Sequence, residues 1–236
     1  MIAFTLASWS CGGCRGPAAD GTNILLITVD SLRADHLGFA GFSGAQTPAM
    51  DQLAASGAFF TRAFTPSPEA APALMSLHTG QYPASHGVWT GDTGALAETA
   101  VTLAEVLKTK GYRTHACASS IQLHPKFGLG QGFDAYTLAF ADAPRPSAAV
   151  ETGMIASKVA DRALEFLETA REGTFFLWIN FYDPHYFYAP PEPFESSFKD
   201  RLYDGEIAFV DRELGRILAK LKDYGLDRRT IVVLAG

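Results

Sequence analysis

One stretch constrains the fold more than any other, residues 23–38, NILLITVDSLRADHLG. Its apolar part is aliphatic and β-branched with little polar alternation, which is typical of a strand buried on both faces of a parallel sheet. The apolar run ends at Asp30. In open parallel α/β sheets, ligands bind beyond the carboxyl ends of the strands, so Asp30 is a candidate metal ligand. The alternative is that Asp30 caps the turn that follows.

Similar apolar runs alternate with helical patterns along the chain. Strands are predicted over 112–119, 174–181 and 230–234, with a shorter β-like run over 58–64. Helices are predicted over 48–56, 72–79, 99–110, 148–168 and 204–222. This alternation predicts an α/β fold, a three-layer αβα sandwich with a mostly parallel central sheet. Because the last predicted strand runs almost to Gly236, we expect the sheet to be incomplete at the C-terminus.

The charge of the chain excludes some partners. Its formal net charge is −6, and no cluster of Lys and Arg is present to neutralise phosphates, so we expect no binding of nucleic acid. No run of 18 apolar residues occurs, and no transmembrane helix is therefore predicted.

Residues 1–20 differ from the rest of the chain and are predicted to be a leader, followed by a single domain over 21–236. The apolar start and the small residues before Cys11 resemble a secretory signal or a bacterial lipoprotein anchor, although Trp9 departs from the anchor pattern. We expect an exported protein, periplasmic or at the cell surface, with a lipid anchor as one option. Cys11 and Cys14 complete no zinc site, and Cys117 is predicted to be a buried thiol.

An ordered series of segments resembles the sulfatase family of the alkaline phosphatase superfamily. After residues 23–38 come TPAMDQLAASGAFFTRAF, APALMSLHTGQYPASHGV, GYRTHACASS, GLGQGFDAY, FYDPHYFYAPPEPF and YDGEIAFVDRELGRIL. GYRTHACASS and GLGQGFDAY resemble a strand and the loop after it. The series covers residues 23–236, in the order in which the family has these segments.

The resemblance implies an alkaline phosphatase-like fold and a hydrolase of sulfate esters, with a small sulfated sugar or aryl sulfate as substrate. The family binds a divalent cation, usually calcium, through carboxylates at strand ends, which suits a hard cation. Its nucleophile is a Cys or Ser converted to formylglycine. Basic and histidine side chains stabilise the negative oxygens and protonate the leaving group.

The sequence departs from the family at the nucleophile. Pro72 matches the proline of the motif Cys/Ser-x-Pro-x-Arg, so Ala70 takes the nucleophile position and Leu74 the arginine position. A methyl group cannot become formylglycine. Thr65 or Ser67 is an alternative nucleophile, although neither has the motif's proline two residues later.

The metal site departs from the family as well. Many members have a second Asp where this chain has Ser31, and members continue past the last strand into an Asp-His or Asp-Asn pair, whereas this sequence ends at Gly236. A single carboxylate cannot supply the six to eight oxygens that calcium takes.

The remaining site residues are predicted with alternatives. His185 is the catalytic candidate, in contact with a sulfate oxygen or the leaving group; otherwise it pairs with Asp183. The candidates for substrate binding are Arg33, His86, Ser119 and His124. For Arg33 an ion pair with Asp35 is the favoured alternative, and for His86 a structural role in its loop. Tyr186, Phe187 and Tyr188 either line a substrate pocket or shield the loop.

Three functions follow from these observations. The first is a sulfatase-family protein with little or no activity. The second is a catalytically inactive pseudoenzyme or gene fragment. The third is a phosphodiester or phosphonate hydrolase, or a phosphoethanolamine-type transferase, that uses Thr65 or Ser67.

Overall fold

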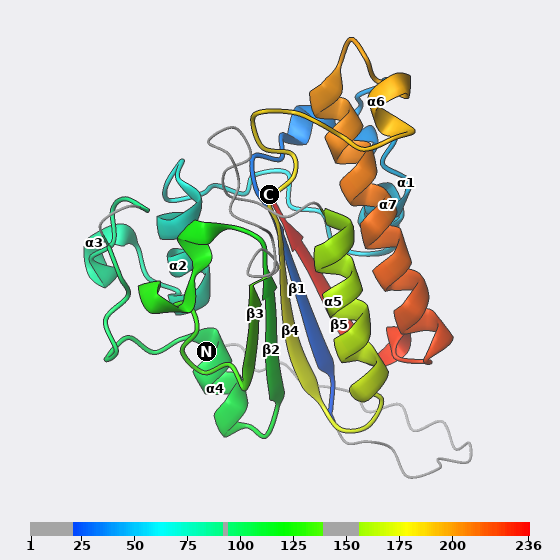
Figure 1. The fold of residues 1–236 in the computed structure, drawn as a ribbon. Helices are drawn as coiled ribbons and strands as arrows, with labels where there is room; N and C mark the ends of the chain where they lie inside the picture. Colours follow the sequence, from blue (N-terminus) through cyan, green and yellow to red (C-terminus); the bar gives the residue numbers. More distant parts are fainter. Residues whose placement is uncertain (1–20, 92–93, 139–155) are drawn as a thin grey trace, which may run out of the picture.

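The computed structural model describes residues 21–91, 94–138 and 156–236 (Figure 1). At its centre is a five-stranded sheet of order β3-β2-β4-β1-β5, in which each neighbouring pair of strands is parallel. The strands are β1 (Asn23–Val29), β2 (Arg113–Ala118), β3 (Ala135–Leu138), β4 (Phe175–Phe181) and β5 (Thr230–Ala235). The predicted leader, residues 1–20, lies outside the described residues.

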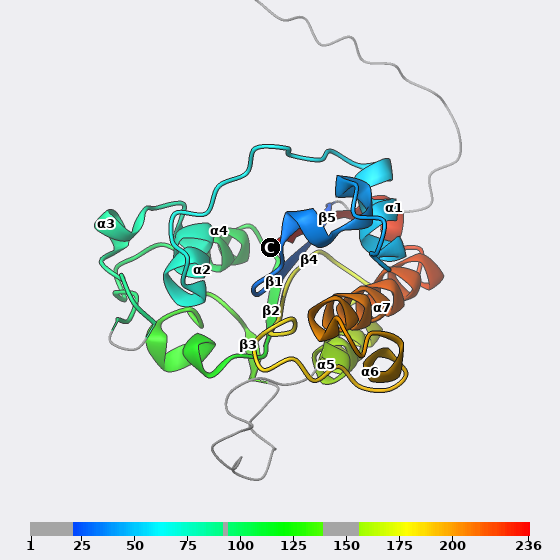
Figure 2. The ribbon, with the colours of Figure 1, turned by 90° about the horizontal axis from the view of Figure 1, so that it is seen from above.

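Helices cover both faces of this sheet (Figure 2). On one face lie α1 (Pro48–Ser56), α5 (Ala156–Thr169), α6 (Phe194–Ser197) and α7 (Leu202–Asp223). On the other lie α2 (Ala70–Thr79), α3 (Pro83–His86) and α4 (Leu103–Thr109). The predicted three-layer αβα sandwich is confirmed.

The alternation of side chains along each strand builds two cores. Leu25, Ile27 and Val29 of β1 point into the core beneath α5 and α7, whereas Leu26 points into the core beneath α2 and α4. All seven residues of β4 are buried because that strand lies in the middle of the sheet. Burial on both faces is the physical reason for the unbroken apolar runs in the sequence.

Capping residues fix the ends of two helices. Thr102 and Glu105 form a reciprocal capping box that fixes the start of α4. Helix α2 ends at Gly80, whose φ of 67° lies in the left-handed region that glycine adopts without strain. Helix α7 begins two residues before its predicted start, at Leu202.

Three details differ from the prediction. Residues 58–64 form no strand; Phe60 and Phe64 are exposed, so the apolar run lacks the neighbouring strand that would make it part of the sheet. The segment expected as a loop contains the edge strand β3, which pairs with β2 along only four residues. The loop expected around His86 contains the short helix α3 (Pro83–His86). Of the predicted helix 148–168, residues 148–155 lie outside the described residues.

Two further predictions concern membrane-spanning helices and the thiol of Cys117. None of their helices is long and apolar enough to cross a membrane. Cys117 is a buried free thiol, and burial raises its pKa to about 12, so this cysteine behaves as a small apolar side chain. Cys11 and Cys14 lie outside the described residues.

Candidate functional site

Polar residues gather where the parallel strands end. Asp30 follows β1, Ser119 follows β2, and Asp183 and His185 lie in the loop after β4. Because the strands are parallel, these positions share one edge of the sheet, the upper edge in Figure 1. The backbone N–H of Asp30 donates to Phe181 O at 2.9 Å, so the ends of β1 and β4 are joined directly. This carboxyl edge is the candidate site.

Asn180 orients the Asp30 carboxylate. The Asn180 Nδ2 amide donates to Asp30 Oδ1 at 3.0 Å and to Thr28 Oγ1 at 3.2 Å. Thr28 Oγ1 also accepts from Trp178 Nε1 at 3.0 Å and donates to Ile179 O at 3.4 Å. These bonds use the full capacity of the Thr28 hydroxyl. The amide of Asn180 therefore has a fixed orientation, with its N–H groups facing Asp30.

The burial of Asp30 disfavours the charged form of its carboxyl group. Burial raises its pKa to about 6, although the hydrogen bond from Asn180 and the charge of His185 lower it. The expected alternative was a turn cap. Within the described ranges, however, the side-chain partner of Asp30 is the Asn180 amide, and residue 33 stands at the N-cap of the next 3-10 turn.

The loop after β4 presents His185. Its Nδ1 lies 2.7 Å from Tyr186 O, and its ring stacks on Tyr182 with centroids 4.3 Å apart. Since a carbonyl oxygen only accepts, Nδ1 holds a proton and Nε2 is the second nitrogen available to a ligand. The Asp183 carboxylate accepts from Ala156 N at 2.7 Å, and burial raises its pKa to about 6. His185 and Asp183 thus have separate hydrogen-bond partners in the described part of the chain.

Glu206 of α7 holds the far end of this loop. Its Oε1 accepts from Ala189 N at 2.6 Å. Oε2 is buried and has no partner with hydrogen-bond geometry among the described residues, although the backbone of His185 is close enough to lower the pKa. Burial dominates and raises the pKa of Glu206 to about 8. The loop is therefore tied down at Asp183 and again at Ala189.

The turn after Asp30 is fixed by Tyr203 of α7. The Tyr203 hydroxyl donates to Ser31 O at 2.7 Å and accepts from Arg33 N at 2.9 Å. Ser31 has a φ of 56°, a conformation that non-glycine residues rarely adopt. The Arg33 guanidinium forms the expected ion pair with Asp35, at 2.7 Å, and both side chains are exposed. An anion at Arg33 would compete with Asp35.

The other predicted substrate ligands have local partners. His86 Nε2 lies 2.9 Å from Ser76 Oγ, and its Nδ1 accepts from Val88 N, so this buried ring ties α2 to the loop after α3. Ser119 donates to Asn180 O at 2.7 Å. His124 Nδ1 accepts from Lys126 N at 3.1 Å. Of these three, Ser119 is bonded to Asn180, the residue whose side-chain amide orients Asp30, and the roles in substrate binding stay predictions.

The predicted nucleophile position lies at the start of a helix. Ala70 is the first residue of α2, and Leu74 is buried in the core between α2 and the sheet. The hydroxyls of the alternative nucleophiles serve their own loop: Thr65 Oγ1 donates to Ser67 O at 2.8 Å, and Ser67 Oγ accepts from Glu69 N at 3.1 Å.

The described residues do not fit the divalent cation that the family uses. They contain no group of three His, Cys, Asp or Glu side chains able to hold a metal ion. The polar neighbour of Asp30 is moreover an amide N–H donor, the wrong polarity for a cation. The donor groups of this part of the chain therefore support no chemical step through a metal ion.

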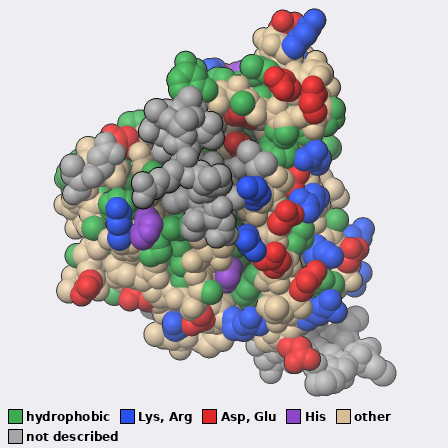
Figure 3. All heavy atoms as spheres, viewed as in Figure 1, with side chains coloured by type: hydrophobic (Ala, Val, Ile, Leu, Met, Phe, Trp, Pro, Cys, Tyr) green, Lys and Arg blue, Asp and Glu red, His purple; other side chains and the backbone are tan. Residues whose placement is uncertain are grey.

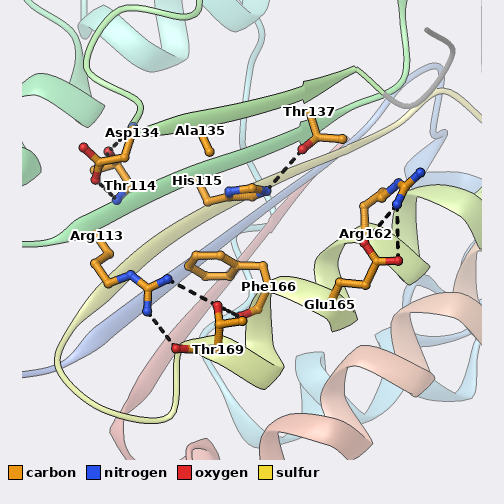
Figure 4. A pocket seen from close by; sticks show the side chains of 10 residues that line it. All are labelled: Arg113, Thr114, His115, Asp134, Ala135, Thr137, Arg162, Glu165, Phe166 and Thr169. Atoms are coloured by element: carbon orange, nitrogen blue, oxygen red, sulfur yellow. Dashed lines mark hydrogen bonds and ion pairs between the residues drawn. The ribbon is translucent and has the colours of Figure 1, made fainter. Parts of the chain in front are cut away.

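A hollow of about 340 Å³ lies elsewhere, between α5 and the strands β2 and β3 (Figure 4). The ring of His115 stacks on Phe166 there, and Arg113 donates to Thr169 O at 2.8 Å. Arg113 is the first residue of β2 and Asp134 precedes β3, so this hollow reaches the amino ends of the strands. It is separate from the carboxyl edge.

The sequence model of the sulfatase family matches residues 22–236. The chain belongs to the sulfatase family. Arylsulfatase A of Bos taurus is 41% identical over 102 residues, which cover 41% of this chain and 20% of the relative. N-acetylgalactosamine-6-sulfatase of Mus musculus is 26% identical over 256 residues, which cover 89% of this chain and 49% of the relative.

The fold agrees with this membership. The crystal structure of Ps i-CgsB in complex with k-i-k-neocarrahexaose superposes with a TM-score of 0.76 at 23% identity, covering 91% of this chain and 58% of that one. This sulfatase-family chain thus spans about half the length, or less, of the two curated relatives.

Three residues of the site were missed by sequence reasoning: Asn180, Tyr203 and Glu206. Asn180 had a readable signal, because it is the one strongly polar side chain in the buried strand FFLWINF. Tyr203 and Glu206 had none, since their roles depend on α7 packing beneath two loops that are distant in the sequence.

Proposed function

We propose that this chain binds sulfate esters at the carboxyl edge of its sheet and does not hydrolyse them through a formylglycine. The observation that carries the proposal is Ala70 at the first position of α2, where the family motif has its nucleophile. The neighbouring hydroxyls of Thr65 and Ser67 bond within their own loop. A site that keeps its histidine and loses its nucleophile is suited to recognition.

His185 is the proposed ligand for the sulfate group. Its Nδ1–H is used by Tyr186 O, so in the protonated ring Nε2–H is the donor for a sulfate oxygen. Stacking on Tyr182 and the two anchors of the loop restrict the ring's motion. The names of the relatives, an arylsulfatase and an N-acetylgalactosamine-6-sulfatase, support a sulfated aryl or sugar ligand.

The test combines turnover and binding on the same protein. We expect 4-nitrophenyl sulfate to show no hydrolysis above buffer, with or without calcium, and to bind in calorimetric titration. His185→Ala should weaken that binding by about tenfold, equivalent to 1.4 kcal/mol. His115→Gln, in β2 beside the hollow of Figure 4, is the matched control and should bind as the unaltered chain does.

Two results would overturn the proposal. Hydrolysis that scales with protein concentration and disappears in His185→Ala would show that the chain has a nucleophile. Absence of binding to both 4-nitrophenyl sulfate and inorganic sulfate would remove the recognition role.

A further inference from the structure

Aromatic rings continue outward from His185 as an exposed surface. Tyr186 is 64% exposed and Phe187 69% exposed. The ring centroid of Tyr186 lies 3.9 Å from that of Phe187 and 5.8 Å from that of Tyr188. The ring centroids of Tyr188 and Tyr203 are 5.2 Å apart. We call these four residues the aromatic platform. Hydrophobic side chains protrude in Figure 3 at the upper edge of the molecule, where Figure 1 draws the loop after β4.

Folding does not account for this exposure. The loop is held by the Asp183 bond to Ala156 N and the Glu206 bond to Ala189 N, neither of which involves the rings. Tyr186 and Phe187 therefore leave apolar area in water without fixing the loop. Clustered exposed aromatic side chains of this kind mark interaction sites.

The platform is adjacent to His185, the residue proposed to bind the sulfate group. Tyr186 follows His185 in the chain, and its carbonyl oxygen accepts from the histidine ring. At the other end, the Tyr203 hydroxyl is fixed between Ser31 O and Arg33 N. A ligand with its sulfate at His185 would extend over rings whose positions are set by both β1 and α7.

The shape and chemistry of the platform favour a sugar ring over a planar aryl group. An aryl group gains most affinity when both of its faces are enclosed, and two hollows of the described ranges, beside His115 and beside Pro125, are lined by residues outside the platform. A pyranose has an apolar C–H face that stacks on an open ring and a rim of hydroxyls that suits tyrosine O–H groups. Tyr186 and Tyr188 carry such hydroxyls, whereas the hydroxyl of Tyr203 is bonded to Ser31 O and Arg33 N.

We propose that the aromatic platform is a saccharide subsite, on which Tyr186 and Phe187 stack the pyranose next to the sulfated sugar of a glycan chain. This inference rests on the proposed function, because the sulfate at His185 sets the position of the neighbouring ring. The platform contributes affinity that does not depend on the sulfate group.

The test titrates the chain with a sulfated galactan hexasaccharide, the same hexasaccharide after desulfation, and 4-nitrophenyl sulfate. The double variant Tyr186→Ala/Phe187→Ala should bind both hexasaccharides about tenfold more weakly and 4-nitrophenyl sulfate unchanged. His185→Ala should weaken binding of the two sulfated ligands alone. Trp89→Ala, at a 64% exposed aromatic residue in the loop after α3, is the matched control. Tyr186→Phe, which keeps the ring, should bind within twofold of the unaltered chain.

The outcomes separate the two proposals. Unchanged hexasaccharide binding in the double variant, or weakening confined to 4-nitrophenyl sulfate, would overturn the saccharide subsite. Equal binding of sulfated and desulfated hexasaccharide by the unaltered chain, with both lost in the double variant, would support the subsite and overturn sulfate recognition at His185.

Discussion

The side-chain amide of Asn180 lies 3.0 Å from the Asp30 carboxylate, inside the edge of the sheet where β1 and β4 end. This bond links β1 and β4 at the carboxyl edge of the sheet, the candidate site. It also joins Asp30 to a network that continues through Thr28 to Trp178. A buried network of this kind is stable only while each member keeps its partner.

Asn180→Ala should lower the free energy of unfolding by about 2–4 kcal/mol, because Asp30 and Thr28 each lose a donor inside the protein. Urea unfolding measures this change. Asn23→Ala is the matched control, since Asn23 is also buried and lies at the amino end of β1. We expect both variants to lose stability, because each amide is buried and hydrogen-bonded to a neighbouring strand. A loss in Asn180→Ala below about 1 kcal/mol would contradict the role of this bond in joining β1 to β4.

Glu206→Gln should stabilise the chain at alkaline pH. The pKa of Glu206 rises from 4.5 to about 8 on folding, so the unfolded chain releases this proton first and stability falls as the pH rises from 4.5 to 8. The glutamine variant lacks this loss and should gain about 3–4 kcal/mol relative to the unaltered chain between pH 5 and pH 9. Urea unfolding at both values checks the gain. Glu195→Gln, at an exposed position of α6, should show no such change.

His78→Leu should remove a loss of folding stability at acid pH. The His78 ring is buried against Trp178, with centroids 4.2 Å apart, and neither ring nitrogen has a hydrogen-bond partner among the described residues. Burial lowers its pKa from 6.5 to about 4, so the unfolded chain binds the proton first and stability falls as the pH drops from 6.5 to 4.

The unaltered chain should therefore lose about 2–3 kcal/mol through His78 between pH 7.5 and pH 4.5, and the leucine variant should not. Urea unfolding at the two pH values measures the difference. His124→Gln, at a half-buried histidine, is the control. Identical pH slopes for the unaltered chain and His78→Leu would refute this role of His78.

Asp211→Ala should weaken the attachment of α1 to α7. The two oxygens of Asp211 accept from Ala49 N at 3.0 Å and Met50 N at 2.8 Å, so a carboxylate of α7 satisfies the first free N–H groups of α1. We expect a loss of about 2–4 kcal/mol in thermal or urea unfolding. Asp161→Ala, at an exposed residue of α5, should cost less than about 1 kcal/mol. A loss in Asp211→Ala as small as that of the control would show that packing alone holds α1.

The sequence by itself determined the layers of the fold and the edge of the sheet that holds the candidate site. Uninterrupted apolar runs mark strands buried on both faces, and the polar residues that end them mark the carboxyl edge, because both follow from hydrophobic burial along a local stretch. Ala70 could likewise be placed by counting along the chain from Pro72.

Only the tertiary structure decided which polar groups meet. The bond from Asn180 to Asp30 depends on the register of β1 against β4, and the anchoring of two loops by Tyr203 and Glu206 depends on how α7 packs. The exposed run at 58–64 and the short edge strand β3 depart from the sequence-based prediction for the same reason: a strand exists only where a neighbouring strand accepts its hydrogen bonds. Such contacts join residues up to 172 positions apart, and no local pattern encodes them.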